Sequence, residues 1–137
     1  MENVRDGGEM EKDREVWIGN TRMYLGEDNV SYVTVVGEID ERTARKMQKT
    51  VERFIDIVGD NVQKINVLVD LNEAGKPSSQ ARKILTDMND HERTGKIAHW
   101  GLNPVAKVLA NFTMGVSRNK NMRFFKTREE ALAWLKE

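Results

Sequence analysis

The chain has 137 residues, enough for one domain that buries about two-thirds of the surface exposed by its unfolded form. It contains no cysteine, which excludes disulfides, thiolate metal sites and cysteine nucleophiles and fits a reducing compartment. The 22 basic residues balance the 22 acidic ones, so no overall field attracts nucleic acid or anionic lipid. No apolar run approaches the roughly 20 residues of a membrane span. We therefore expect a cytoplasmic protein that binds no nucleic acid.

The N-terminal segment differs in composition from the rest of the chain. Residues 1–15 are rich in charge and glycine and almost free of bulky apolar side chains, so they cannot offset the entropy of ordering. We expect a flexible tail over residues 1–15 and a single domain over residues 16–137.

The domain begins with a predicted hairpin. A strand region covers Val16 to Leu25, a turn cluster follows at Gly26 to Asn29, and Val30 to Ile39 is dense in β-branched and aromatic residues. Both faces of this second segment are largely apolar, which indicates an interior strand.

Helices and strands then alternate. Asp40 stands where an N-cap belongs, and apolar residues at three- and four-residue spacings predict a helix as far as Val58. Further strands are predicted at Ile65–Leu71, Ile97–Trp100 and Met122–Phe125, and further helices from Ser78, from Pro104 and from Thr127, the last with a Thr-Arg-Glu-Glu capping box. The order β-β-α-β-α-β-α-β-α predicts an α/β fold with a mostly parallel sheet, an antiparallel N-terminal pair and four helices.

The last third of the chain resembles a known family. The helix that opens at Asn103-Pro104, the short strand Met122–Phe125 and the final helix with Glu130-Ala131-Leu132 are similar to the C-terminal third of STAS domains. The likeness extends over roughly residues 23–137 and is greatest to the SpoIIAA-like branch, the anti-sigma-factor antagonists, which has also been grouped with CRAL-TRIO lipid-binding domains. The resemblance implies a STAS-like sheet and a regulatory protein-binding role.

The resemblance also singles out two serines. Ser78 and Ser79 stand where partner-switching STAS proteins carry a phosphorylated serine in an Asp-Ser-Ser-Gly turn, and Ser79 is the better positional match. Pro77-Ser78-Ser79-Gln80 lacks the flanking Asp and the Gly of that motif. We therefore favour Ser78 as a simple helix cap over phosphorylation of this site by an anti-sigma-like kinase.

The helix from Pro104 carries more large apolar residues than one core stripe needs. Val105, Val108, Leu109, Phe112 and Val116 form the stripe expected to face the core. Trp100, Leu102, Phe112 and Met114 are the candidate surface for a partner protein, a second copy of the chain or an apolar ligand.

Catalysis finds little support in the sequence. His99 beside Trp100 is a candidate ligand or base at a strand end, but an ordinary strand histidine explains it as well. There is no phosphate loop, dinucleotide fingerprint or zinc-type histidine pair. We expect no enzyme activity, no metal and no cofactor. The leading hypothesis is a regulatory protein-binding module, and the alternative is a carrier or sensor of an apolar small molecule or lipid, which requires a hollow between the sheet and the helices.

Overall fold

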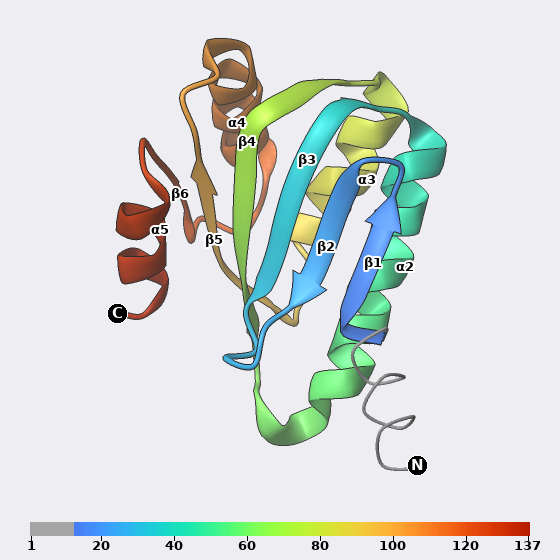
Figure 1. The fold of residues 1–137 in the computed structure, drawn as a ribbon, viewed down its shortest axis with the longest axis vertical. Helices are drawn as coiled ribbons and strands as arrows, with labels where there is room; N and C mark the ends of the chain where they lie inside the picture. Colours follow the sequence, from blue (N-terminus) through green and yellow to red (C-terminus); the bar gives the residue numbers. More distant parts are fainter. Residues whose placement is uncertain (1–12) are drawn as a thin grey trace.

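One mixed sheet organises the computed structural model, which describes residues 13–137 (Figure 1). Its six strands lie in sequence order; β1, β2 and β3 pair antiparallel, and β3 to β6 pair in parallel. The elements are β1 (Glu15–Ile18), β2 (Thr21–Leu25), β3 (Ser31–Ile39), α2 (Glu41–Val58), a 3-10 turn (Gly59–Asn61), β4 (Ile65–Pro77), α3 (Ser79–Asn89), β5 (Thr94–Trp100), α4 (Pro104–Val116), β6 (Met122–Phe125) and α5 (Arg128–Leu135). The predicted fold class is confirmed.

The N-terminal strand region is two strands where the sequence predicted one. Ile18 pairs with Thr21, so Gly19 and Asn20 alone form the turn between β1 and β2. Gly19 has φ 60°, a backbone conformation that residues with a Cβ adopt only at a cost in free energy. Residues 1–12 of the predicted tail lie outside the described part of the chain. Glu15, which was also predicted in the tail, belongs to β1 and pairs with Tyr24 of β2.

The central strand is longer than predicted. We expected it to end at Leu71, but β4 continues to Pro77 because β3 runs beside it as far as Ile39, which pairs with Pro77. The Ser78 amide then donates to the Ile39 carbonyl at 2.9 Å. The end of the sheet thus places the first residues of α3.

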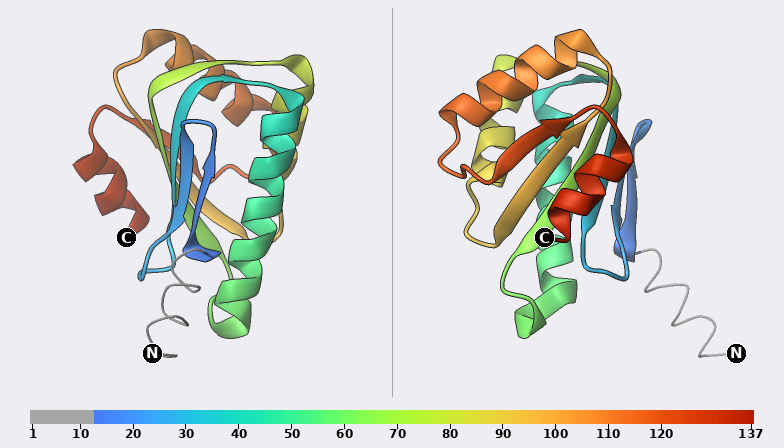
Figure 2. Two further views of the ribbon diagram at one scale, coloured as in Figure 1. Left: turned by 45° about the vertical axis from the view of Figure 1, so that its right-hand side comes forward. Right: turned by 90° about the vertical axis from the view of Figure 1, so that its left-hand side faces the viewer.

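Helices cover the two faces of the sheet unequally (Figure 2). Three helices, α2, α3 and α4, pack on one face, while α5 alone packs on the other, against β4, β5 and β6. The core under α2 and α3 is built around Met23, Leu25, Val33, Met47 and Phe54, and the smaller core under α5 around Leu68, Ala98 and Trp134. The first face therefore holds most of the buried apolar volume.

Side-chain caps start the helices where the sequence predicted them. Asp40 accepts from the Thr43 amide at 2.7 Å, and this hydrogen bond holds the pKa of the Asp40 carboxyl below its usual value. Thr127 accepts from the Glu130 amide at 3.2 Å at the start of α5. The predicted caps of α2 and α5 are confirmed, but the Glu130 carboxylate of the capping box accepts from the Thr127 hydroxyl at 2.9 Å and not from the Thr127 amide.

Helix α4 is rotated relative to the prediction. Val105, Val108, Phe112 and Val116 were expected in the core, but they are exposed. The buried residues are Ala106 and Ala110, whose small side chains let the helix backbone approach the sheet closely. A helix that is apolar on most sides has several stripes at the same period, so spacing alone could not identify the inner one.

Candidate ligand-binding site

An apolar hollow of about 150 Å³ lies between the sheet and the three helices that cover its first face. The sheet contributes inward-facing residues of β3, β4 and β5, among them Val33, Val69 and His99. The helical side is lined by Met47, Val51, Phe54 and Ile55 of α2, Leu85 and Met88 of α3, and Ala106, Leu109, Ala110 and Thr113 of α4. Well-packed interiors hold few voids larger than a water molecule, so a hollow of this size is a feature to explain.

His99 is the most unusual group in the lining. It is 8% exposed, and Nδ1 of its ring has no hydrogen-bond partner within the described part of the chain. Burial lowers the pKa of His99 to about 4, because the apolar surroundings disfavour the charged imidazolium. At neutral pH the ring is therefore an uncharged group that can donate or accept one further hydrogen bond in the hollow.

The strand order explains why His99 faces the hollow. His99 pairs with Val69 of β4 on one side and with Phe124 of β6 on the other. Helix α4 contacts both β4 and β6, so it crosses the strand between them. Side chains alternate along a strand, and His99 therefore points to the α4 face while Ala98 and Trp100 point to the α5 face.

A second polar atom in the lining also lacks a partner. Ser31 is 4% exposed, and its Oγ has no hydrogen-bond partner among the described residues. The two threonine hydroxyls of the lining are occupied: Thr113 donates to the Leu109 carbonyl at 3.0 Å, and Thr94 donates to the Met88 carbonyl at 2.9 Å. Two buried hydrogen-bonding atoms without a described partner thus remain in a mainly apolar wall.

The charged side chain of the lining is committed to the fold. Arg93 donates to the carbonyls of Gly59, Val62 and Gln63 at 2.6 to 2.8 Å, which ties the end of α2 to the start of β5. None of the described lining residues is a carboxylate. His99 therefore has no acidic partner in the hollow, and the site can bind by apolar contact and single hydrogen bonds.

The two candidate serines lie at the N-terminus of α3, and neither lines the hollow. Ser78 Oγ accepts from the Ala81 amide at 3.1 Å, so its predicted role as a helix cap is confirmed. Ser79 is exposed, and its Oγ accepts from Arg82 at 3.3 Å. Ser79 is open to solvent, and its phosphorylation stays a prediction.

The four residues predicted to form one binding surface are not brought together. Leu102 and Phe112 are exposed, at 75% and 58%, but Met114 is half-buried. Trp100 is half-buried on the opposite face of the sheet, in the cluster under α5. A single surface formed by all four is therefore wrong, because Trp100 and α4 lie on different sides of the sheet.

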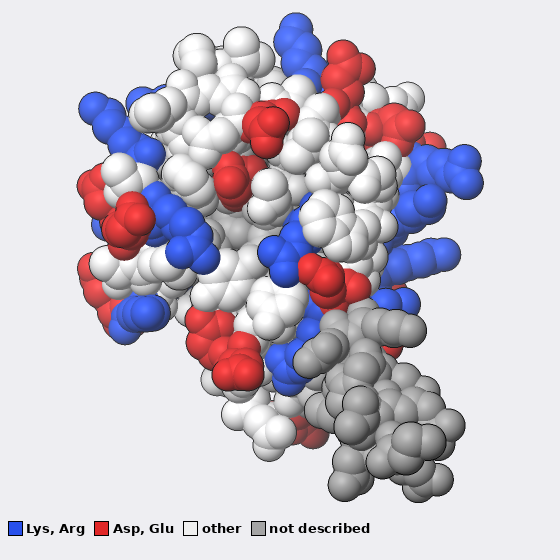
Figure 3. All heavy atoms as spheres, viewed as in Figure 1, with Lys and Arg blue, Asp and Glu red and all other residues white. Residues whose placement is uncertain are grey.

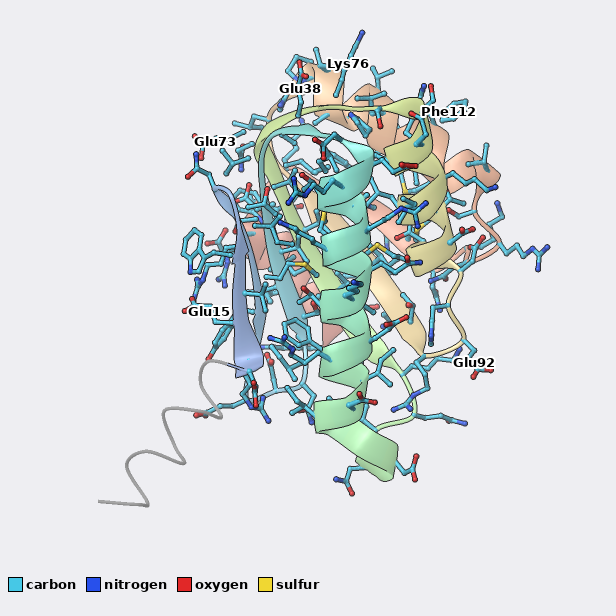
Figure 4. All side chains as sticks on the ribbon, turned by 90° about the vertical axis from the view of Figure 1, so that its right-hand side faces the viewer. Glu15, Glu38, Glu73, Lys76, Glu92 and Phe112 are labelled. Atoms are coloured by element: carbon cyan, nitrogen blue, oxygen red, sulfur yellow. The ribbon has the colours of Figure 1, made fainter. Side chains whose placement is uncertain are left out.

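The exposed apolar residues of α4 form a different group, here called the α4 outer stripe. Phe112 lies at the outer surface of the molecule (Figure 4), and the surface at the upper left of Figure 3, over α4, is largely uncharged. The α4 outer stripe consists of four residues of α4 and Leu102, which lies just before the helix: Leu102, Val105, Val108, Phe112 and Val116, all more than half exposed. The sequence placed the four helical residues in the core and Leu102 on the surface.

A groove on the other face of the sheet had no counterpart in the sequence analysis. It is lined by Arg22, Tyr24, Tyr32, Trp100 and Arg128, with other residues of β3, of β4 and of the turn between β2 and β3. The Tyr32 hydroxyl donates to Asp28 at 2.6 Å; burial, together with this hydrogen bond, raises the pKa of Tyr32 to about 12. The available signal was that Arg22 and Tyr24 alternate with the buried residues Thr21, Met23 and Leu25 along β2, but this pattern does not show which residues of β5 and α5 join them.

His99 was singled out by the sequence, whereas Ser31 and Thr113 were not. Nothing in the sequence marks an inward-facing serine on a predicted interior strand as unpartnered. Among the described residues, no group of histidine and carboxylate side chains could hold a metal ion. The described helices are all too short or too polar to cross a membrane.

Comparisons with known proteins agree with the geometry of the sheet. An uncharacterized protein with a SpoIIAA-like fold from Shewanella loihica PV-4 is similar, with 16% identity, a TM-score of 0.64, and 84% of this chain and 91% of that one covered. The anti-sigma factor antagonist SpoIIAA in its unphosphorylated form has 15% identity and a TM-score of 0.57, with 85% of this chain and 97% of that one covered.

The phosphorylated form of the Bacillus cell fate determinant SpoIIAA is also similar, with 14% identity and a TM-score of 0.51 over 84% of this chain and 98% of that one. At these identities the likeness concerns the fold. No curated protein sequence matches the chain. A family model described as SpoIIAA-like matches residues 30–136, and the chain therefore belongs to the SpoIIAA-like family.

Proposed function

We propose that this protein is a non-enzymatic binding protein that takes a small, mainly apolar molecule into the hollow between its sheet and α2, α3 and α4. The observation that carries the proposal is an apolar hollow of about 150 Å³ whose lining includes His99 and Ser31, two residues whose buried Nδ1 and Oγ atoms have no partner among residues 13–137. Of the two hypotheses raised by the sequence, a carrier requires such a hollow and a protein-binding module does not.

Energetics support an occupant. Sealed voids left by core truncation cost about 24 cal/mol per Å³, and because the hollow is only partly enclosed, the roughly 3–4 kcal/mol that this gives for 150 Å³ is an upper limit. Each buried polar atom without a partner adds about 1–3 kcal/mol. A molecule that fills the hollow recovers part of both costs, which is a physical source of affinity.

The volume also sets the size of the molecule. A cavity of about 150 Å³ engineered in another protein stays dry and binds benzene. The hollow here has the same volume, so the molecule is of the size of one aromatic ring or a short branched chain.

A blocking variant tests the proposal. Ala110 is buried and lines the hollow, so Ala110→Leu places three more carbons in it, while Val108→Leu adds a methylene to the exposed side of the same helix. Benzene binding, followed by NMR chemical shifts and by the rise in melting temperature, is expected in the native protein and in Val108→Leu and is lost in Ala110→Leu. Ala106→Val is a milder filling variant if the leucine disturbs folding. Benzene that fails to bind the native protein, or that binds Ala110→Leu as well, contradicts the proposal.

The α4 outer stripe favours a second candidate, a regulatory protein-binding module of the anti-sigma-factor-antagonist kind. Four large apolar residues on one exposed helix face, with Leu102 just before the helix, are more than a solvated surface needs, and α3, with the exposed Ser79 at its start, packs beside α4. One of the similar structures is that of an anti-sigma factor antagonist.

Two substitutions on the α4 outer stripe test this second candidate. Phe112→Ser combined with Val108→Ser removes exposed apolar surface without touching the hollow. A partner that co-purifies with the native protein, or a self-associated form detected by analytical ultracentrifugation, is expected to be lost in this variant and retained in the control Trp17→Ser, which removes an exposed apolar side chain from β1. Ser79→Asp then tests whether charge at the start of α3 blocks the same complex. A native protein that is monomeric and free of partners removes the support for this candidate.

A further inference from the structure

His99 sets the chemistry of the molecule that the hollow accepts. Resting on the proposed function, we propose that the hollow selects a small apolar molecule with one uncharged hydroxyl group, such as a phenol or a short alcohol, and that this hydroxyl bonds to His99 Nδ1. The hollow provides the apolar contact, and Nδ1 is the buried atom that needs a partner.

The position of the ring favours His99 over Ser31 as the contact. Ser31 pairs with Val67, which pairs with Ile97, so His99 lies two strands and two residues away from Ser31. With about 4.8 Å between strands and about 3.3 Å per residue, the two sites are on the order of 12 Å apart. A single-ring molecule therefore cannot reach both. His99 lies beneath α4, whose residues Leu109 and Thr113 line the hollow with it, whereas Ser31 lies on β3 and pairs with Leu25 of β2.

The state of the imidazole determines the class of polar group. The buried ring is neutral at neutral pH, so it offers no charge to a carboxylate or a phosphate. Arg93, the charged residue of the described lining, already donates to three backbone carbonyls. An anion would therefore lose its hydration without a free cation to replace it. A hydroxyl group both donates and accepts, so it satisfies Nδ1 in either tautomer of the ring.

Phenol and benzene form a matched pair of probes, because they share a ring and differ by one hydroxyl group. We expect the full chain to bind phenol about 3- to 10-fold more tightly than benzene, the range that one net hydrogen bond provides. The nitrogen chemical shifts of the His99 ring are expected to move with phenol and to stay nearly unchanged with benzene.

Two substitutions assign the preference to His99. His99→Leu is expected to retain benzene binding and to lose the preference for phenol, whereas His99→Asn, whose amide keeps a polar atom near the position of Nδ1, is expected to retain the preference. Ser31→Ala is the control at the other unpartnered atom and is expected to leave the preference unchanged. Retained benzene binding shows that each variant is folded.

The outcomes separate this inference from the proposed function. Equal affinity for phenol and benzene in the native chain, as expected if an ordered water satisfies Nδ1, overturns the inference and leaves the proposed function standing. A preference that survives in His99→Leu also overturns it. A native chain that binds neither probe contradicts the proposed function, and the inference fails with it.

Discussion

Replacement of His99 is expected to change how stability depends on pH. The pKa of His99 is about 4 in the folded protein and 6.5 in an unfolded chain. Below pH 6.5 the unfolded chain takes up a proton that the folded protein refuses, so this residue destabilises the fold increasingly as pH falls from 6.5 toward 4, and contributes nothing above 6.5. By the linkage relation, His99 lowers the free energy of unfolding by about 2 kcal/mol between pH 7.5 and pH 5. The decrease reaches about 3 kcal/mol at a pH low enough to protonate His99 in the folded protein as well.

The assay is urea unfolding of the native protein, His99→Leu and His99→Asn at pH 7.5 and pH 5. Acidic residues contribute to the pH dependence of all three proteins alike, so the difference between native and variant isolates His99. Between pH 7.5 and pH 5 the free energy of unfolding is expected to fall by about 2 kcal/mol less in the variants than in the native protein. Leucine and asparagine differ in packing and polarity, so the two variants differ in stability at pH 7.5. Because both substitutions remove the titrating imidazole, they must change the pH dependence of stability equally. Parallel pH profiles for the native protein and both variants would refute a neutral, buried His99.

Three further predictions concern the helices and turns that surround the hollow. Ser78→Ala removes the cap of α3 and is expected to cost about 1 kcal/mol in urea unfolding, whereas Ser79→Ala costs less than about 0.5 kcal/mol; equal effects would contradict the cap assignment. Gly115→Ala, in the last turn of α4 with open space around it, is expected to stabilise by about 0.5–1 kcal/mol, while Gly19→Ala, at φ 60°, destabilises by about 1–2 kcal/mol; a stabilising Gly19→Ala would rule out the turn between β1 and β2. Phe54→Ala empties a fully buried site and is expected to lower the stability by about 3–5 kcal/mol in thermal unfolding, whereas Phe112→Ser changes the stability by less than about 0.5 kcal/mol. A large loss of stability in Phe112→Ser would show that the ring is buried in the core.

Local signals in the sequence identified most of the secondary structure. Asp40, Ser78 and Thr127 act as helix caps as expected, since a cap depends on a side chain and an amide two or three residues away. The alternation of strands and helices after Ile39 was sufficient to predict a parallel arrangement of β3 to β6. The turn at Gly19 and Asn20 was missed because two residues carry little signal and the flanking segments are both strand-like.

Three-dimensional neighbours decided what the local signals left open. The extension of β4 to Pro77 depends on β3, a partner strand almost 40 residues earlier in the sequence. The orientation of α4 depends on which of its apolar stripes fits the sheet, and the closest approach belongs to Ala106 and Ala110 and not to the larger side chains.

The sequence by itself thus determined the class of fold, the caps and the presence of a histidine on β5. Only the tertiary structure decided that His99 lines a hollow, that its Nδ1 has no partner in the part of the chain that the structure describes, and that the α4 outer stripe faces solvent. The physical reason is that secondary structure follows from contacts a few residues apart, whereas a hollow is space left between elements that meet only after folding. Its walls come from β3, β4, β5 and three helices, and no one of these segments encodes it alone.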